Sequence, residues 1–218
     1  PWSRWWSASS PRPLPGTARL LNLGTVPNDR YQGIERIDIT GTANNTLRGF
    51  NIGNVGATGT ALAGTSFGTL NVSELGITTN GQALNLATGT LGGSFSALSS
   101  SGGTNNVLLS SVATGGTNRT LGTASDALSG ATGDALRIDG GNGSFTYAGN
   151  ITNTATLAVN IINKTFFSVA LSGQINPPAA GRGNSLGNNS STTISYTGSA
   201  QKISSGAGAG VGLSGNNG

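Results

Sequence analysis

The sequence predicts an all-β fold, a single-stranded parallel β-helix (β-solenoid) of about seven to eight coils with roughly 24–25 residues in each. Gly contributes 37 of the 218 residues, and the glycines separate short runs in which apolar and polar residues alternate. Two such runs recur along the chain with one shared period. A stack of coils about 4.8 Å apart explains the recurrence, because equivalent strands pair in parallel and their inward side chains form apolar columns.

The composition favours a folded chain over a disordered one. Charged residues make up 8% of the chain, where about 25% is typical. Disorder usually combines a high net charge with few apolar side chains, whereas here the hydrophobic fraction is 35% and the formal net charge is +4. The chain has no Cys, so disulfide bonds and thiolate metal sites are excluded.

Residues 1–33 differ from the rest of the chain. All three tryptophans lie within Pro1–Trp6, and prolines occupy alternate positions in Pro11–Pro15. Alternating prolines remove backbone donors from a β-ladder and block a helix. We therefore expect an irregular Trp/Pro-rich tail, or the end of a preceding region, before a parallel β-helix repeat domain over residues 34–218 that is a fragment of a longer array.

The first strand series has a small polar residue followed by an apolar–polar–apolar pattern. Its lead apolar residues are Leu47, Leu70, Phe95, Leu121, Phe145, Val169 and Ile194. They are 23 to 26 residues apart, with a mean of about 24.5. The alternation predicts that Leu70 and Val72 point inward, and that Tyr147 and Tyr196 share one column two coils apart.

A second strand series lies between the members of the first. Its members are Ala61–Leu62, Ala83–Leu86, Val107–Leu109, Ala135–Ile138, Ala158–Ile161 and Val211–Leu213, with a degenerate copy at Ser185–Leu186. A helical repeat would show a period of 3.6 over ten or more residues, and a propeller blade needs about 40 residues. Neither pattern is present, which leaves the β-solenoid.

Gly and Asn pairs fall between the predicted strands. The pairs are Gly92–Gly93, Gly102–Gly103, Gly115–Gly116, Gly140–Gly141, Asn44–Asn45, Asn105–Asn106 and Asn188–Asn189. Gly adopts positive φ without a steric penalty, and Asn tolerates the left-handed region and can stack in hydrogen-bonded ladders. We expect these pairs at corners, and longer loops around Asp126–Ser129 and Pro177–Ala180.

Two runs resemble a known family. Gly130–Ile138 (GATGDALRI) and Gly140–Ile151 (GGNGSFTYAGNI) resemble right-handed parallel β-helix repeats of large bacterial surface and adhesin-like proteins, similar to autotransporter passengers. Gly33–Gly41 (GIERIDITG) resembles a phrase of such exoproteins. The resemblance covers about residues 33–218, and right-handedness comes from it alone. It implies a secreted or outer-surface location, no cofactor and no defined active site.

One charged cluster is a candidate site. Asp134 and Asp139 flank one predicted strand, Arg137 lies between them, and Asp126 lies in the loop before it. Polysaccharide cleavage needs two carboxylates, or acids together with Arg or Ca²⁺, so these residues could bind a small cation or a sugar. The alternative is a solvated turn with a weak surface ion pair. We favour the alternative, because a surface patch lacks the enclosed cleft that catalysis prefers.

Other chemistry finds little support in the sequence. Nucleophilic catalysis lacks His and Cys, and a Ser–Lys pair would need a buried Lys164 or Lys202, both of which we expect to be exposed. Gly140–Ser144 approaches a calcium-binding repeat, but Ser144 replaces the Asp ligand and the motif occurs once, so no metal is expected. Six of the eleven basic residues lie in the first 48 positions, which leaves the repeats without a basic face for nucleic acid.

These observations predict a structural or adhesive segment of a secreted or surface-displayed bacterial protein, without catalysis or a cofactor. Its expected partners are surface glycans or a host or neighbouring cell surface, and the segment is not expected to insert into a membrane. Uncapped ends of the stack predict edge-to-edge self-association. The alternative is a carbohydrate-binding or polysaccharide-cleaving β-helix whose site lies in missing coils or near residues 126–139.

Overall fold

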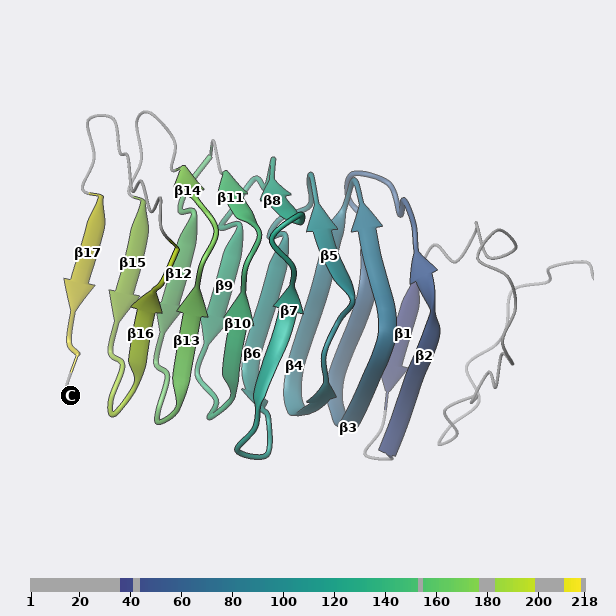
Figure 1. The fold of residues 1–218 in the computed structure, drawn as a ribbon, viewed down its shortest axis with the longest axis horizontal. Helices are drawn as coiled ribbons and strands as arrows, with labels where there is room; N and C mark the ends of the chain where they lie inside the picture. Colours follow the sequence, from purple (N-terminus) through teal and green to yellow (C-terminus); the bar gives the residue numbers. More distant parts are fainter. Residues whose placement is uncertain (1–35, 41–43, 153–154, 177–182, 199–209, 217–218) are drawn as a thin grey trace, which may run out of the picture.

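A computed structural model describes five stretches of the chain: residues 36–40, 44–152, 155–176, 183–198 and 210–216. Every regular element in them is a β-strand, and Figure 1 shows the strands stacked side by side along a rod. They form a parallel β-solenoid of about six turns, close to the seven to eight coils expected. The predicted fold class is confirmed, while the tail over 1–33 and the loop at Pro177–Ala180 lie outside the described residues.

Each complete coil contributes to three faces of the rod, with three separate strands in coils 4 to 6. We number the coils by their strands: β1 and β2 in coil 1, β3 in coil 2, β4 and β5 in coil 3, β6 to β8 in coil 4, β9 to β11 in coil 5, β12 to β14 in coil 6, β15 and β16 in coil 7, and β17 in coil 8. The longest strands, β3 and β4, bend around corners and contribute to more than one face.

The first face contains the second predicted strand series. Its strands are β1 (Ile37–Thr40), β3 (Thr60–Thr79), β4 (Gln82–Gly93), β6 (Val107–Ala113), β9 (Leu136–Asp139), β12 (Val159–Ile162), β15 (Asn184–Gly187) and β17 (Val211–Ser214). Leu62, Leu84, Val107, Leu136 and Val159 stack in register and are at most 1% exposed. Burying each such side chain stabilises the fold by about 1.5–3 kcal/mol.

The second face contains most of the first predicted series. Its strands are β2 (Asn44–Ile52), β7 (Asn118–Gly122), β10 (Ser144–Tyr147), β13 (Ser168–Leu171) and β16 (Thr193–Tyr196), together with parts of β3 and β4. Tyr147 pairs with Leu171, which pairs with Tyr196, so the predicted shared column is confirmed. The inward orientation of Leu70 and Val72 is also confirmed, because both are buried.

The register of the early coils differs from the prediction by an even number of residues, two at Leu47 and four at Leu70. Leu47 pairs with Val72 rather than with Leu70, and Leu70 pairs with Leu91 rather than with Phe95. A shift by an even number of residues keeps every side chain on its own face. The alternation of apolar and polar residues is therefore equally compatible with the predicted and the observed pairing. The number of residues in the corners determines which pairing forms.

A third face completes the coil and is not among the predicted strand series. Its strands are β5 (Ala97–Ser100), β8 (Ala127–Ser129), β11 (Asn150–Thr152) and β14 (Ile175–Asn176), together with the ends of β2 and β3. The expected loop around Asp126–Ser129 is wrong, because β8 pairs there with β11 and Leu128 is buried. The strands β8, β11 and β14 have only two or three residues, which is too short to show alternation.

A column of left-handed residues forms the corner between the first and second faces. In coils 2 to 8 the residue that follows the first-face register has positive φ; these residues are Ser66, Thr88, Ser111, Gly140, Asn163, Asn188 and Gly215. Of the glycines predicted at corners, Gly92 and Gly102 lack positive φ. The same left-handed residue thus recurs in coils 2 to 8, and its side chain varies.

Candidate functional site

The charged cluster lies on the first face, on the outward side of β9. Leu136 and Ile138 point inward and are buried, so Arg137 between them points outward. Its Nη2 donates to Asp139 Oδ2 at 2.9 Å, and its Nη1 lies 3.7 Å from Asp134 Oδ2. The structure therefore brings these three predicted site residues together around one guanidinium.

The next coil supplies further hydrogen-bond donors to both carboxylates. Asn160 Nδ2 donates to Asp134 Oδ2 at 2.7 Å, and Thr156 Oγ1 donates to Asp134 Oδ1 at 3.0 Å. Asn163 Nδ2 donates to Asp139 Oδ1 at 2.9 Å. All four carboxylate oxygens thus have partners within the protein, and a cation at this position would have to compete with them.

The electrostatics of Asp139 do not suit an acid catalyst. Partial burial of Asp139 acts to raise its pKa. The hydrogen bonds from Arg137 and Asn163 and the positive charge of Arg137 act in the opposite direction, so the pKa of Asp139 is lower than its usual value. A glycosidase acid needs a raised pKa so that it stays protonated. The cluster instead connects coil 5 to coil 6, which favours the structural interpretation over a sugar-cleaving site.

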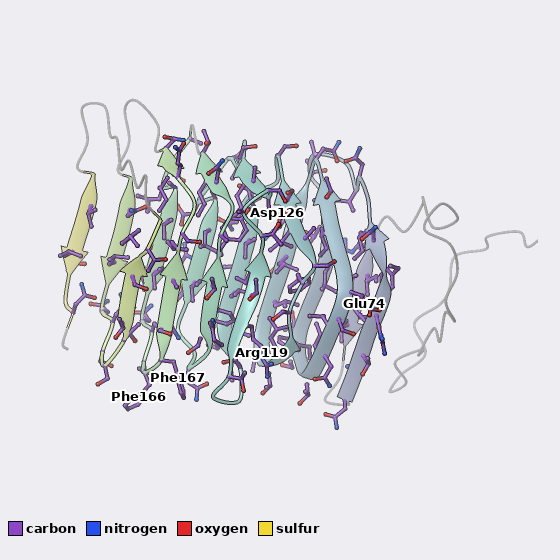
Figure 2. All side chains as sticks on the ribbon, viewed as in Figure 1. Glu74, Arg119, Asp126, Phe166 and Phe167 are labelled. Carbon is purple, nitrogen blue, oxygen red and sulfur yellow. The ribbon has the colours of Figure 1, made fainter. Side chains whose placement is uncertain are left out.

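Asp126 lies in the turn before β8 of the third face (Figure 2), whereas the other three predicted residues cluster at β9 of the first face. Its Oδ1 accepts from Ser99 Oγ at 2.8 Å, and its Oδ2 accepts from the Thr123 backbone N–H at 2.6 Å and the Thr123 hydroxyl at 2.9 Å. Burial, with a smaller contribution from the Asp126 charge, raises the pKa of Tyr147. Asp126 is buried and stabilises the turn before β8 by joining it to coil 3.

Lys164 is buried, contrary to the expectation from the sequence. It is 0% exposed, its Nζ donates to the Gly143 carbonyl, and the Nζ lies 5.8 Å from the centre of the Phe145 ring. Burial lowers the pKa of Lys164 to about 8. The other lysine considered for a Ser–Lys pair, Lys202, lies outside the described residues.

An asparagine ladder explains the position of Lys164. In coil 7, Asn189 Oδ1 accepts from the Lys164 backbone N–H at 3.0 Å, and Asn189 Nδ2 donates to the Ile161 carbonyl at 2.9 Å. In coil 8, Asn216 repeats both bonds with the Asn189 N–H and the Leu186 carbonyl. Lys164 occupies the equivalent position in coil 6. Lys164, Asn189 and Asn216 follow one another at intervals of about one coil. This spacing is a sequence signal that could have indicated the burial of Lys164.

No protein-family model, curated protein or solved structure matches this chain. Within the described residues, no group of three or more acidic side chains is placed to hold a metal ion. The described part of the chain contains no helix with the length and apolar character needed to cross a membrane.

Proposed function

We propose that these coils form a rigid spacer and contact segment of a larger secreted or surface-displayed bacterial protein. One observation carries the proposal: the parallel register continues from β1 to β17 along the first face, over a core of buried apolar side chains. A stack of this kind adds about 4.8 Å of length with each coil. Its stiffness comes from backbone hydrogen bonds between neighbouring coils.

Side chains add further connections between neighbouring coils. The Arg137 cluster joins coil 5 to coil 6, Asp126 joins coil 3 to coil 4, and the asparagine ladder joins coils 6 to 8. Each connection keeps adjacent coils in one register, which a spacer that transmits force requires. The structural use of these polar residues supports a spacer more than an enzyme.

The proposed location is supported by the resemblance of Gly130–Ile138 and Gly140–Ile151 to repeats of bacterial surface proteins. The outward positions of the second face support a contact role, because small polar residues such as Asn71, Thr146 and Ser195 occupy them. Such residues offer hydroxyl and amide groups to a partner and little net charge. Contact with a cell surface would therefore depend on hydrogen bonding and shape more than on ionic attraction.

A peptide epitope inserted between Gly115 and Gly116 tests the location. Both glycines have positive φ, and a Cβ added at either one would meet open space, so this corner should tolerate the insertion. We expect an antibody against the epitope to label intact cells of the source bacterium or its culture medium. Labelling that occurs only after the cells are permeabilised would overturn the proposed location.

A further inference from the structure

The corner of coil 6 exposes two adjacent aromatic side chains. Phe166 is 60% exposed and Phe167 is 40% exposed. They lie between β12 and β13, and Figure 2 places both at the lower edge of the rod. Large apolar side chains in this position contribute little to the core, because the neighbouring inward positions are already filled by Phe145 and Val169.

The backbone of this aromatic pair is strained. Phe166 has a φ of 61° and Phe167 a φ of 65°, a region that bulky residues rarely adopt. Each such residue costs on the order of 1–3 kcal/mol. Coil 7 holds the conformation, because the Phe166 N–H donates to the Ser190 carbonyl at 3.0 Å and the Thr193 N–H donates to the Phe167 carbonyl at 3.2 Å.

The fold itself does not require aromatic residues at this corner. By the register of β13 and β16, Ser191 and Thr192 of coil 7 are the equivalents of Phe166 and Phe167. Ser191 also has positive φ, at 48°, whereas Thr192 lacks the positive φ of Phe167. The left-handed residue at the position of Phe166 therefore forms with a small polar side chain, and coil 7 passes the corner without a left-handed residue at the position of Phe167. Strain and exposed apolar surface without a structural benefit point to a function for the pair.

Polar groups without net charge border the aromatic pair. Asn142, one coil below, and Ser191, one coil above, are both exposed. The Lys164 amine points into the interior, and Asp139, which precedes the equivalent corner of coil 5, is paired with Arg137. Arg119, two coils below, donates to the Thr114 carbonyl. A neutral ligand with hydroxyl groups therefore suits these surroundings better than a charged one.

The size of the apolar surface also limits the kind of partner. A Phe side chain buries about 150–250 Å² when covered completely, so the exposed parts of the pair offer roughly 200 Å² together. A stable protein interface buries about 800 Å² on each partner. The pair is too small for a protein partner or a second copy of the chain, but it matches the C–H face of one or two sugar rings.

We infer that Phe166 and Phe167 form a platform on which the pyranose rings of a neutral glycan stack. The C–H groups of a pyranose face pack against the aromatic rings, while Asn142 and Ser191 are placed to hydrogen-bond the sugar hydroxyls. Coil 7 holds the two residues in position before the ligand arrives, which reduces the entropy lost on binding. This inference rests on the contact role in the proposed function and names the class of partner.

Binding of neutral hexasaccharides tests the platform. The whole chain is titrated with β-1,4-glucan, β-1,4-galactan, α-1,4-glucan and α-1,6-mannan hexasaccharides by calorimetry or NMR. We expect at least one to bind with a Kd below 10 mM, and the variant Phe166→Ser/Phe167→Thr to bind it at least ten-fold more weakly. The substituted residues are those of coil 7 at equivalent positions, so the variant should keep the β-sheet circular dichroism spectrum and the unfolding temperature.

The variant Leu213→Ser provides the control, because Leu213 is 71% exposed on β17 of coil 8, on the first face and two coils from the aromatic pair. It removes exposed apolar surface away from the platform and should bind the glycan as the unsubstituted chain does. Two outcomes would overturn the inference: no hexasaccharide binds, or the Phe166→Ser/Phe167→Thr variant retains full affinity. Dimerisation that this variant abolishes would instead assign the pair to a second copy. The cell-labelling experiment does not involve these residues, so the two proposals can fail separately.

Discussion

Coils 6 and 7 turn the same corner with the same number of residues but with different side chains. Asn163 and Asn188 both begin the turn with positive φ, and Phe166 and Ser191 continue it. Coil 7 then places small polar side chains where coil 6 has Lys164 and the aromatic pair. The backbone of the corner thus follows from stacking on the neighbouring coils, whereas its side chains can serve other purposes.

The two coils differ in the core as well. On the first face Val159 of coil 6 pairs with Asn184 of coil 7, which pairs in turn with Val211. Asn184 is 0% exposed, and neither of its side-chain polar atoms has a hydrogen-bond partner among the described residues. Coil 6 buries Lys164 where coil 7 buries Asn189. Coil 7 in turn buries Asn184 where coil 6 has Val159. The following three predictions exchange or remove these groups.

The largest effect is expected for Asn189→Ala in coil 7. The substitution leaves the Lys164 N–H and the Ile161 carbonyl without the Asn189 side chain, and each lost partner of a buried group costs about 1–3 kcal/mol. We expect the free energy of unfolding to fall by about 2–4 kcal/mol, measured by urea denaturation. The Lys164 amide should also exchange with solvent deuterium on the order of 100-fold faster.

Thr193→Ala is the control for this prediction, because Thr193 is exposed on β16 of the same coil. Its effect on unfolding should stay within about 0.5 kcal/mol. An unchanged exchange rate of the Lys164 amide in Asn189→Ala would contradict the ladder.

A smaller effect of opposite sign is expected for Asn184→Val, which gives coil 7 the core residue of coil 6. Removing a buried amide without partners and adding apolar contacts to Val159 should stabilise the protein by about 2 kcal/mol. The measurement is again urea denaturation. Asn184→Asp should act in the other direction, because it places a charge in the same position. An Asn184→Val protein less stable than the unsubstituted chain would show that the amide has a partner in solution.

The smallest effect concerns the dependence of stability on pH near Lys164. Its pKa falls from 10.5 in the unfolded chain to about 8 in the folded one, so between these values the unfolded state binds more protons. Stability therefore rises with pH in this window. A midpoint near 8 gives a gain of about 1 kcal/mol between pH 8 and pH 9, which urea denaturation at the two pH values can measure.

Lys164→Met keeps a long buried side chain without the amine and should show no gain over this range. Measurements should stop below about pH 9.5. Burial raises the pKa of Tyr196 to about 12, and the pKa of Tyr147 is also raised, so the folded state binds more protons above pH 10 and stability falls there. A flat profile in the unsubstituted chain would contradict a buried, titrating lysine.

Much of the fold was predictable because each stacked strand must place apolar residues at the same inward positions as the strands of the neighbouring coils. The column from Leu62 to Val159 and the pairing of Phe145 with Val169 and Ile194 follow from an apolar residue at a regular interval. The three clustered site residues, Asp134, Arg137 and Asp139, were also predictable, since they lie within six residues of each other on one strand and its ends. The local sequence is enough to predict a cluster of this kind, because its residues are close together in the chain as well as in space.

The remaining features depend on contacts between coils. The third face was missed because strands such as Ile175–Asn176 are too short to show a pattern. The partner of Leu47 was misassigned because a shift of two residues preserves its face. The aromatic pair at Phe166 and Phe167 has no local signal that separates an exposed corner from a buried strand. Only the residues of the next coil show which positions point outward.

The sequence by itself determined the fold class, the repeat length and the inward-facing columns. The alternation of apolar and polar residues and the interval between repeats can both be read directly from one sequence. The tertiary structure alone decided the register between early coils, the burial of Lys164 and the exposure of the aromatic pair. The physical reason is that each coil forms its hydrogen bonds and its core with the coils above and below, about 25 residues away in the chain. Corner lengths in those neighbours therefore determine which side chains meet.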